Sequence, residues 1–284
     1  MKQIAILGAH GQLGRTLQSI SALSKDTYYF YSKKEMDITN IESVKEVFNS
    51  QDFDFCVNCA AYTNVEGAEV NVEQAFLVNA TGVKNVAEVC QSKSVILIHI
   101  STDYVFNGLK KRPYKTDDST NPINQYGRSK LQGELYIKEI MKAYYIIRTS
   151  WLYSAFGKNF VKTIMTKIDE NARLNITTEE NGTPTSCIDL SKFIIHLVEN
   201  NSVEYGVYNF SAQGNTTWYG FAGEIAKLYY PKRVANISAT DSFKTVAERP
   251  KNSVLDIEKT EKVYKNLKYW QQSLDEIVNE LKKQ

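Results

Sequence analysis

The chain has 284 residues, of which 43% are hydrophobic and 23% are charged, and its formal net charge is +2 at pH 7. A chain of this length forms one or two domains, and this composition supports a core that needs no disulfides, which excludes a disordered chain. The balance of 34 Lys and Arg against 32 Asp and Glu gives no electrostatic reason to expect a nucleic acid or a membrane surface as partner.

The sequence shows no sign of export or membrane insertion. Its first apolar run, Ile4–Leu7, is much shorter than the hydrophobic segment of a signal peptide, and no stretch approaches the roughly 20 apolar residues that cross a bilayer. We therefore expect a cytoplasmic protein with free thiols. Cys56 and Cys59 form a C-x-x-C motif, but they lie in an apolar run that indicates a buried strand, and no second Cys or His pair nearby completes a zinc site.

In the first half of the chain, short apolar runs alternate with amphipathic stretches. The apolar runs predict strands at Ile4–Leu7, Thr27–Tyr31, Asp54–Asn58, Val95–Ser101 and Tyr144–Arg148. The stretches between them predict helices at Leu13–Leu23, Ile41–Asn49, Val72–Gln91 and Tyr126–Met141. Apolar strands that alternate with helices indicate an α/β fold with a doubly wound parallel Rossmann sheet, so residues 1–150 are expected to form an NAD(P)-binding domain.

After Trp151 the predicted helices are separated by longer polar stretches. The pattern predicts helices at Lys158–Asn171, Asp189–Asn200, Trp218–Tyr230 and Ser273–Lys283, and strands at Leu174–Thr177 and Val207–Phe210. No Pro-, Gly- or Ser-rich linker marks the change. Residues 151–284 are therefore expected to form a smaller mixed α/β substrate-binding lobe that packs on the first domain, with late segments that can return to the Rossmann sheet.

Three glycines follow the first predicted strand. Gly8, Gly11 and Gly14 form a G-x-x-G-x-x-G motif that opens the first predicted helix. Residues without a Cβ permit a tight turn there and let backbone N–H groups approach a pyrophosphate, which the positive end of the helix dipole also favours. A purely structural turn would show the same spacing, but the position at a strand–helix junction favours a dinucleotide site.

The residues after the second predicted strand bear on which dinucleotide binds. A ribose-binding carboxylate at this point usually marks NAD, whereas here Ser32, Lys33 and Lys34 stand at the tip, where a cation can hold a 2′-phosphate. The sequence therefore favours NADPH, with NADH as the alternative if the lysines are only a solvated patch. Asp37 and Ile38 follow, and we expect them along the adenine.

A tyrosine and a lysine stand four residues apart at the start of a predicted helix. Tyr126 and Lys130 therefore share one helix face, and an ammonium beside a phenol is expected to lower the pKa of the phenol. Thr102 ends the strand before this helix, where it faces the ligand crevice. This arrangement suits a general acid that protonates a carbonyl oxygen as a hydride arrives. An ordinary Tyr–Lys pair on a surface helix is the alternative.

Together these motifs resemble the extended short-chain dehydrogenase/reductase family, and within it the reductases of dTDP-rhamnose biosynthesis. The likeness runs through the whole chain, in the segments GAHGQLG, CAAYTNVEGAE, STDYVFNG, NPINQYGRSKLQGE, IIRTSWLYSAFGKNFVKT, NGTPTS, GVYNFSAQGNTTWYGFA and RPKNSVLD. The resemblance implies NADPH-dependent reduction of the C4 ketone of dTDP-4-dehydrorhamnose to dTDP-L-rhamnose, the last step of that pathway.

The resemblance also implies a role for each matching residue. The catalytic residues would be Thr102, Tyr126 and Lys130. The pyrophosphate would lie on Gly8, Gly11, Gln12, Leu13 and Gly14, the adenine near Asp37 and Ile38, and the middle of the cofactor along Ala60, Ala61 and Tyr62. The sugar would contact Val65, Asp103, Tyr104 and Trp151, and the nucleotide side of the substrate would contact Asn159, Arg249 and Asn252. Trp218 is expected to pack the lobe rather than to contact a ligand.

Some members of the family form a dimer that Mg²⁺ bridges through acidic residues. The corresponding stretches here contain Arg15 and Thr16 and then Ser186, Cys187 and Ile188, so they offer no carboxylate. We therefore expect no metal site, and either a monomer or a different homodimer.

Two other functions remain open. A relative of these reductases serves as the NADP-binding regulatory β subunit of methionine adenosyltransferase and need not be catalytic. A sister nucleotide-sugar 4-ketoreductase of different C4 stereochemistry would carry the same residues, because the stereochemistry depends on how the sugar lies over the nicotinamide.

Overall fold

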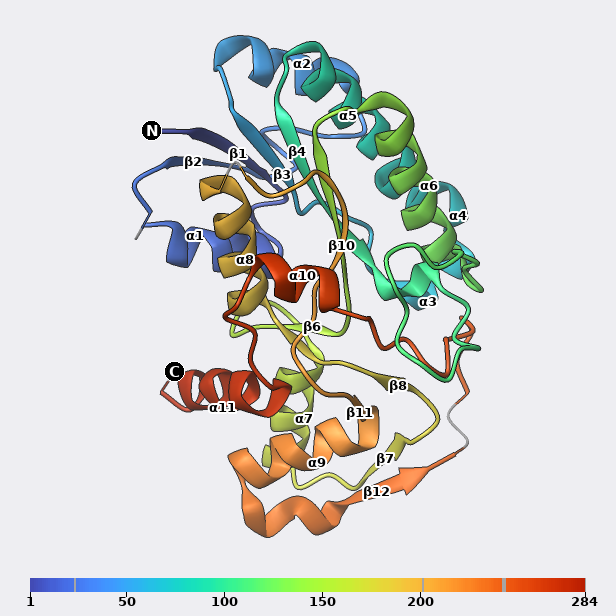
Figure 1. Ribbon diagram of the computed structural model, residues 1–284. Coiled ribbons are helices and arrows are strands. Elements are labelled where there is room, and N and C mark those ends of the chain that lie inside the picture. The colour runs from blue at the N-terminus through green and yellow to red at the C-terminus, as the bar shows by residue number, and fades with distance from the viewer. Residues whose placement is uncertain (23, 201, 242–243, 284) are drawn as a thin grey trace.

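The computed structural model describes residues 1–22, 24–200, 202–241 and 244–283, so Leu23, the expected end of the first helix, lies outside the described residues. In the described part of the chain, six parallel strands form a central sheet in the order β10-β5-β4-β3-β1-β2 (Figure 1). Their bounds are β1 Gln3–Leu7, β2 Thr27–Tyr31, β3 Phe55–Asn58, β4 Ile96–Thr102, β5 Tyr144–Thr149 and β10 Gly206–Asn209. The predicted α/β class and parallel sheet are confirmed.

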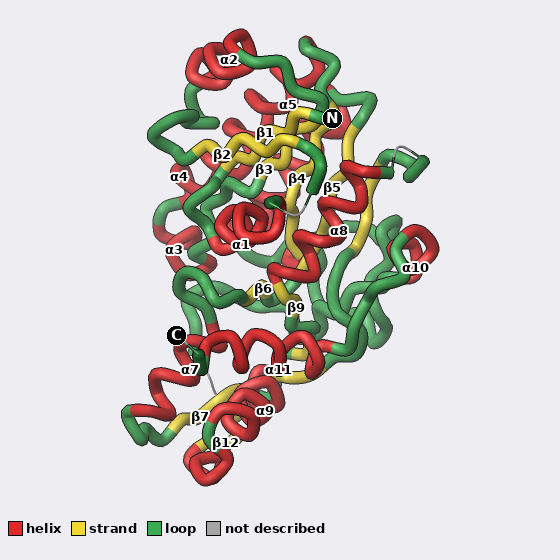
Figure 2. Tube along the Cα trace, turned by 90° about the vertical axis from the view of Figure 1, so that its left-hand side faces the viewer, coloured by secondary structure: helices red, strands yellow, loops and turns green. Residues whose placement is uncertain are grey.

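Helices cover both faces of this sheet (Figures 1 and 2). On one face, α1 and α8 pack on the strands through a core that includes Leu17 and Phe193. On the other face, α2, α5 and α6 pack through a second core that includes Val44, Val86 and Ile137. The bounds of these helices are α1 Gln12–Ser21, α2 Ile41–Ser50, α5 Gly82–Ser92, α6 Gln125–Ile140 and α8 Cys187–Glu199.

Two elements from the second half of the chain belong to this sheet and its covering layers. The strand predicted at Val207–Phe210 is β10, which pairs with β5 at the edge of the central sheet. Helix α8 lies on the face that also carries α1, because Leu190, Phe193 and Leu197 are fully buried there. The chain therefore returns to the Rossmann sheet after it has begun the lobe.

The rest of the second half forms a lobe at the carboxyl ends of the central strands, in the lower part of Figure 1. Its core includes Ile164, Phe221 and Leu274, one from each of three helices. The bounds are α7 Phe160–Asp169, α9 Trp218–Tyr229 and α11 Trp270–Leu281, with the parallel pair β7 Leu174–Thr177 and β12 Ile237–Thr240. Two further short pairs are β6 Leu152–Tyr153 with β9 Thr185–Ser186, and β8 Asn181–Gly182 with β11 Thr216–Thr217.

The helix predicted at Val72–Gln91 is interrupted. It consists of α4 Val72–Phe76, a π-helical turn η1 Leu77–Thr81 and then α5. Turns of this type occur often beside functional sites, and this one places Asn79 in the interior. The prediction of a helical stretch is correct, but its continuity is not.

Several short elements have no counterpart in the sequence prediction. Helices of six residues show too little periodicity to reveal an apolar face, and turns of 3₁₀-helix show none. These elements are α3 Val65–Val70, α10 Glu258–Val263, η2 Asp103–Val105 and η3 Pro231–Asn236.

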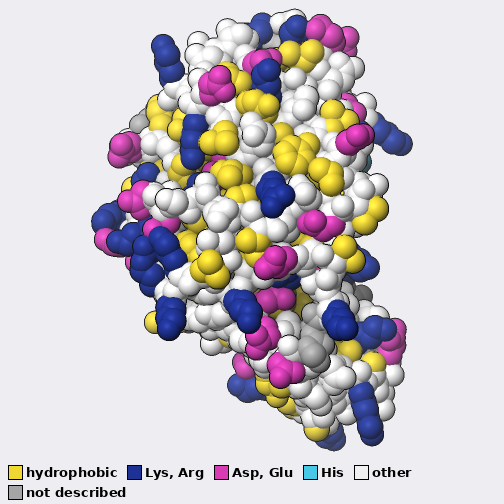
Figure 3. Space-filling view, turned by 90° about the vertical axis from the view of Figure 1, so that its right-hand side faces the viewer, with side chains coloured by type: hydrophobic (Ala, Val, Ile, Leu, Met, Phe, Trp, Pro, Cys, Tyr) yellow, Lys and Arg dark blue, Asp and Glu magenta, His cyan; other side chains and the backbone are white. Residues whose placement is uncertain are grey.

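The face that carries α4 and α6 has a mixed surface (Figure 3). Hydrophobic side chains and side chains of both charges are interspersed on it. The exposed hydrophobic residues include Val70 of α3, Leu77 of η1 and Leu135 of α6. Within the described ranges, no helix combines the length and the apolar character that crossing a membrane requires.

Candidate active site

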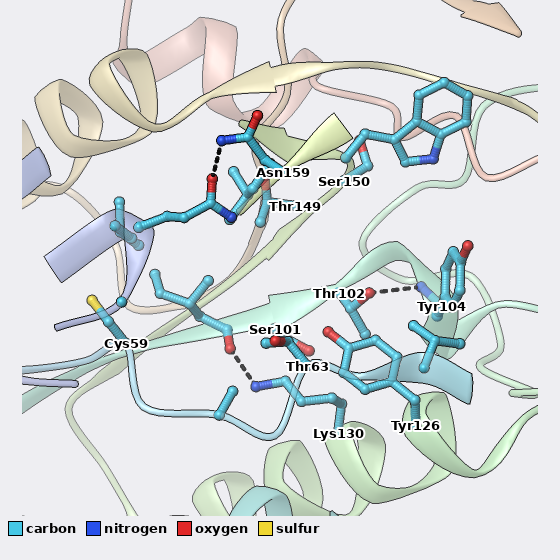
Figure 4. A pocket seen from close by; sticks show the side chains of 18 of the residues that line it. Cys59, Thr63, Ser101, Thr102, Tyr104, Tyr126, Lys130, Thr149, Ser150 and Asn159 are labelled. Carbon is cyan, nitrogen blue, oxygen red and sulfur yellow. Dashed lines mark hydrogen bonds between the residues drawn. The ribbon is translucent and has the colours of Figure 1, made fainter. Parts of the chain in front are cut away.

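The carboxyl ends of the central strands open into a cavity of about 620 Å³ between the sheet and the lobe (Figure 4). Its walls come from the loop after β1, the ends of β4 and β5, the start of α6, and Trp218 of the lobe. A second hollow of about 520 Å³ adjoins it, because His10, Gly11, Cys59 and Ala61 line both. Together they form one elongated crevice, at the place where this fold is expected to bind ligands.

The glycine loop forms the floor where the two hollows meet. Gly8 has a φ of +79°, and a Cβ on it would lie 2.7 Å from the Ala60 nitrogen. A Cβ on Gly14 would lie 2.5 Å from the Gly8 carbonyl oxygen, so this glycine allows α1 to pack closely on the loop. Gly11 is the N-cap of α1 and offers no capping side chain. The first N–H groups of the helix are therefore available to an anion.

The second hollow carries the residues expected at the adenine end. Ser32, Lys33, Asp37, Ile38, Ala60, Ala61 and Tyr62 all line it. Lys33 Nζ lies 3.7 Å from the Asp37 carboxylate, but its side chain is 74% exposed and so free to reorient. Asp37 also accepts hydrogen bonds from the backbone and hydroxyl of Thr39. The structure brings these residues together around one space.

The three predicted catalytic residues line the larger cavity. Thr102 ends β4, while Tyr126 and Lys130 lie on the first turns of α6. The Asn124 side chain caps this helix by accepting a hydrogen bond of 2.8 Å from the Gly127 nitrogen. Lys130 Nζ donates a hydrogen bond of 2.6 Å to the Ile100 carbonyl oxygen, as Figure 4 shows.

The expected effect of Lys130 on Tyr126 is wrong. Burial raises the pKa of Tyr126 to about 12, and a hydrogen bond with Thr102 lowers it only in part. The reason is that Lys130 is aimed at the Ile100 carbonyl rather than at the phenol. Burial also lowers the pKa of Lys130 to about 8 and that of the neighbouring His99 well below its usual range. Tyr126 is therefore a neutral phenol at neutral pH.

Thr102 connects Tyr126 with a buried acid. The Thr102 hydroxyl donates a hydrogen bond of 3.0 Å to Asp103 Oδ1 and accepts one of 3.1 Å from the Tyr104 nitrogen. The Tyr104 ring meets the Tyr126 ring edge-on, with 6.0 Å between ring centroids. Burial raises the pKa of Asp103 to about 7, against the hydroxyls of Ser253 and Thr102, which lower it.

A buried ion pair that the sequence did not reveal supports helix α6 beneath the cavity. Arg148 donates to both carboxylate oxygens of Glu134, at 2.9 and 2.7 Å, and the Ser101 hydroxyl donates to the same carboxylate at 2.6 Å. Burial alone would raise the pKa of Glu134, but Arg148 and Ser101 outweigh it and the pKa is lowered. Glu134 is therefore ionised, and the pair fixes α6 against β4 and β5.

Asn79 is a second residue that no motif pointed to. It is fully buried in the π-helical turn, accepts from the Tyr62 nitrogen at 2.8 Å and donates to the Tyr62 carbonyl oxygen at 2.9 Å. It also donates to the Ser129 hydroxyl at 3.0 Å. Asn79 therefore ties the loop after β3 to helix α6. The only local sign of its role is the π-helical turn in which it lies, and this turn cannot be recognised from the sequence.

The wall opposite the sheet is aromatic. Trp151 has a left-handed backbone, with a φ of +45°, and its ring stacks on Trp218 at 3.7 Å between centroids. A Cβ on Gly182 would lie 2.6 Å from the Trp151 ring, so this glycine makes room for it. Trp218, expected only to pack the lobe, also lines the cavity. Val65, at the start of α3, lines the cavity from the sheet side.

The three residues expected on the nucleotide side of the substrate, Asn159, Arg249 and Asn252, have different surroundings in the structure. Asn159 lines the cavity, caps α7, and donates a hydrogen bond of 3.0 Å to the Gln12 side chain. Arg249 lines a separate hollow of about 280 Å³ with Phe160 and Trp218, and pairs with Glu66 at 2.6 Å.

Asn252 is placed differently from what the resemblance implied. It is not among the residues that line these three cavities. It donates to the Lys110 carbonyl oxygen at 2.7 Å and accepts from the Asn181 side chain at 3.2 Å. In the structure the Asn252 side chain therefore joins two loops.

A family model named the RmlD substrate binding domain matches residues 1–283. The chain belongs to this family. A dTDP-4-dehydrorhamnose reductase of Aggregatibacter actinomycetemcomitans is 34% identical over 276 residues, which cover 93% of this chain and 94% of the relative. A dTDP-4-keto-6-deoxy-D-glucose reductase of Streptomyces niveus is 35% identical and covers 76% of this chain, with 75% of its own length matched.

The similarity to this family also holds for the three-dimensional structure of the whole chain. The crystal structure of dTDP-4-dehydrorhamnose reductase from Bacillus anthracis in complex with NADP superimposes with a TM-score of 0.93 at 35% identity. The match covers 98% of this chain and 99% of that one. The resemblance drawn from the sequence motifs is confirmed.

Proposed function

We propose that the protein reduces the C4 ketone of dTDP-4-dehydrorhamnose to the hydroxyl group of dTDP-L-rhamnose, with NADPH as the reductant. One observation carries this proposal: Thr102 at the end of β4 and Tyr126 at the start of α6 lie together in the cavity that adjoins the glycine loop (Figure 4). The two relatives named as dTDP-4-dehydrorhamnose reductases support the same reaction.

The elongated crevice fits a dinucleotide. The close approach at Gly8 and Gly14 leaves a cradle that a Cβ would fill, and the free N–H groups at the start of α1 suit a pyrophosphate. In this proposal Gly11, Gln12 and Leu13 hold the pyrophosphate, while the residues that line the second hollow hold the adenosine. Lys33, which is exposed at that hollow, supplies the charge for a 2′-phosphate. When bound, NADPH supplies the hydride that reduces the ketone.

Tyr126 is the proton donor in this proposal. Because its pKa is raised to about 12, the phenol remains protonated at neutral pH, and it is still a stronger acid than the alcohol that forms. Thr102 hydrogen-bonds the carbonyl oxygen and holds it against Tyr126. Lys130, fixed by the Ile100 carbonyl, would hold the ribose hydroxyls of the cofactor.

The lobe is proposed to hold the nucleotide sugar. Val65, Asp103, Tyr104 and Trp151 would enclose the sugar ring, and Asn159 would lie on the same side. Phe160 and Trp218 give the smaller hollow flat walls that suit a nucleoside, and the buried Nη1 of Arg249 has no partner there, which suits a phosphate oxygen. Residues 1–150 would thus bind the cofactor and contribute one side of the sugar pocket, and the chain after residue 150, apart from α8 and β10, would supply the rest of the substrate site.

We propose that no metal bridges subunits in this protein, whether it acts as a monomer or as a homodimer. Arg15 lies over the Phe156 ring at 4.7 Å, and the Asp189 carboxylate accepts a hydrogen bond from Ser273 and faces Lys268 at 3.9 Å. Among the described residues, no three His, Cys, Asp or Glu side chains form a group that could hold a metal. The reductase activity and the molecular mass in solution should be unchanged by EDTA or by added Mg²⁺. A fall in activity, or dissociation into smaller species, on addition of EDTA would contradict the proposal.

The test of the reaction is the oxidation of NADPH in the presence of dTDP-4-dehydrorhamnose, with the product identified by NMR. Tyr126→Phe should reduce kcat by about 10²–10⁴-fold, the usual contribution of a general acid. Tyr136→Phe is the matched control, because Tyr136 lies on the same helix and its ring contacts Lys84 outside the cavity. A Tyr126→Phe enzyme as fast as this control would overturn the assignment of the acid.

A sister ketoreductase is the second candidate function. The match to the Streptomyces niveus relative, named as a dTDP-4-keto-6-deoxy-D-glucose reductase, favours it. The product of each 4-keto sugar separates the two, since they differ in sugar substrate and the NMR spectrum reports the configuration at C4. If neither sugar is reduced, capture of a methionine adenosyltransferase by the protein would favour the regulatory function.

A further inference from the structure

The proton that Tyr126 gives away has to be replaced, and a buried carboxyl group, that of Asp103, lies close to it. Asp103 is 2% exposed and lines the cavity. Its Oδ1 accepts the Thr102 hydroxyl, whereas its Oδ2 is buried and makes no hydrogen bond, although the Ser253 hydroxyl lies near enough to lower the pKa of this acid. Among the ion pairs of the described residues, none includes Asp103. A buried carboxylate without a cation is costly, so the neutral acid is favoured.

The hydroxyl of Thr102 links Asp103 to Tyr126 and has only one proton to give. A hydroxyl has one donor and two acceptor positions. When Asp103 is ionised, the proton of Thr102 points to Asp103 Oδ1 and is not available to Tyr126. When Asp103 is protonated, the two acceptor positions of Thr102 match two donors, the Tyr104 N–H and the Asp103 O–H. The proton of Thr102 is then available to the carbonyl oxygen of the substrate and, once Tyr126 has given its own proton away, to the neighbouring phenolate.

We propose that Asp103 is the proton reservoir of the reduction, and that its carboxylic acid proton reaches Tyr126 through the hydroxyl of Thr102. As the C4–H bond forms, the Tyr126 O–H bond breaks and the new alcohol O–H bond forms. Thr102 gives its proton to the Tyr126 phenolate and takes the proton of Asp103. The phenol is restored, Asp103 is left as a carboxylate, and it takes up a proton from water after the product leaves. No further reactant is needed beyond the ketone, the hydride donor and this proton.

The direction of the transfer follows from the acids involved. A carboxylic acid is a stronger acid than a phenol, so a proton moves from Asp103 to a Tyr126 phenolate spontaneously. The pKa of about 7 for Asp103 allows it to be reloaded near neutral pH.

Other groups around Asp103 titrate differently. Burial raises the pKa of Tyr104 above its usual range and that of Tyr126 to about 12, so both stay neutral. Lys130, on the same helix as Tyr126, has a pKa lowered to about 8 by burial. These values leave Asp103 as the first of the three neighbouring side chains to change charge as the pH rises through neutrality.

Two further carboxyl groups and a cation stand near this side of the site: Glu66 on α3, Glu180 in the lobe and Arg249. Arg249 pairs with Glu66. Burial would raise the pKa of Glu66, but the backbone of Val246 and Ala247 and the Arg249 guanidinium outweigh it and lower the pKa. Burial raises the pKa of Glu180, so Glu180→Gln is the control variant for the pH dependence.

The first experiment measures kcat between about pH 5.5 and 9.5 with saturating NADPH and dTDP-4-dehydrorhamnose. The wild type should slow as the pH rises through about 7, because the carboxylate form has no proton to supply and holds that of Thr102. Asp103→Asn should be slower by about 10²-fold near pH 6 and should lack this bend, keeping only the later fall that Lys130 causes at about 8. Glu180→Gln should keep the bend.

A purely structural role for Asp103 gives a different result. In that case Asp103→Asn would slow the reaction by one factor at every pH and leave the bend in place, which would overturn the proposal. Thr102→Ser, which keeps the hydroxyl, should keep the bend, and Thr102→Val should remove it along with most of the activity. A bend that survives in Thr102→Val would equally count against a route through this hydroxyl.

An infrared measurement tests the reservoir without turnover. The wild-type spectrum minus that of Asp103→Asn should show the carbonyl band of a buried carboxylic acid near pH 6, and this band should vanish as the pH rises through about 7. Absence of the band near pH 6 would overturn the proposal. The relay rests on the proposed reduction, and the two fail differently: an inactive wild type contradicts the reduction, whereas an active one with an unchanged bend contradicts the relay.

Discussion

Two buried carboxyl groups in this site, Glu134 and Asp103, differ in what surrounds them. They are 0% and 2% exposed. Glu134 faces the two-pronged guanidinium of Arg148 and the Ser101 hydroxyl, and its pKa is lowered. Asp103 faces hydroxyl groups and aromatic rings, and its pKa is raised to about 7. Burial is the same in both regions, so the partner decides the charge.

The different charge states of Glu134 and Asp103 suit them to different roles, one structural and one chemical. An ionised, fully paired carboxylate such as Glu134 has no proton to give and fixes the position of α6, which carries Tyr126 and Lys130. A neutral acid such as Asp103 holds a proton beside the reacting side chains. One site therefore contains a rigid anchor and an exchangeable proton, built from the same functional group.

The largest expected effect comes from removing the partner of Glu134. Arg148→Met leaves a charge buried with no cation, and we expect a loss of about 3–5 kcal/mol in the free energy of unfolding. Denaturation by urea at neutral pH measures it. The double variant Arg148→Met with Glu134→Leu should recover most of this loss, because no charge is then left buried. A double variant as unstable as the single one would show that packing of Arg148, and not the charge of Glu134, carries the effect.

The second prediction concerns how stability depends on pH near Asp103. The raised pKa means that the folded state keeps a proton which the unfolded state releases, so stability falls as the pH rises from about 4 to about 7. The shift corresponds to at most about 4 kcal/mol. Asp103→Asn removes this dependence, so the stability of the variant relative to the wild type should increase over that interval. Urea denaturation at several pH values measures the difference.

Glu134→Gln is the matched comparison and should show the opposite sign. The lowered pKa of Glu134 means that its contribution is present above the unfolded-state value of about 4.3 and is lost as the pH falls below it. The variant should therefore be less stable than the wild type at neutral pH and approach it in acid. The same sign for both variants would contradict the comparison between the two regions.

The sequence placed the parts of the site that depend on local spacing. The glycine loop, the end of β4 and the start of α6 each follow from a motif of a few residues, and they meet because parallel strands end at one edge of a sheet. The direction of Lys130 could not be predicted, since the Ile100 carbonyl that it contacts is 30 residues away. Arg148 on β5 pairs with Glu134 on α6, and no motif or residue spacing in the sequence predicts such a pair.

The other differences between the sequence prediction and the structure concern contacts between segments far apart in the chain and one irregular helix. The strand at Val207–Phe210 was recognised, but only the finished sheet shows that it joins β5. Asn252 carries a motif typical of the family, yet its side chain joins loops at Lys110 and Asn181. Asn79 lies in a π-helical turn, which apolar periodicity does not distinguish from an ordinary helix.

A smaller effect should separate the two partners of Glu134. Ser101→Ala removes one hydrogen bond to a charged group but leaves Arg148 in place, and we expect a loss of about 1.5–3 kcal/mol in the free energy of unfolding. The same substitution in the Glu134→Gln background should cost less, because the acceptor is then uncharged. Thermal or urea denaturation of the four proteins measures the coupling, and equal losses in both backgrounds would mean that Ser101 does not act through the charge.

The smallest effect should appear on the other side of the comparison, at Ser253. Its hydroxyl lowers the pKa of Asp103, so Ser253→Ala should move the loss of the carboxylic acid infrared band to higher pH, by less than about one unit. Ser191→Ala is the matched control, because Ser191 is also fully buried and its hydroxyl has no partner. An unchanged or lower titration point in Ser253→Ala would mean that Ser253 does not favour the ionised form. A shift in the expected direction would show that hydroxyl groups alone can tune a buried acid that, unlike Glu134, has no cation to hold its charge.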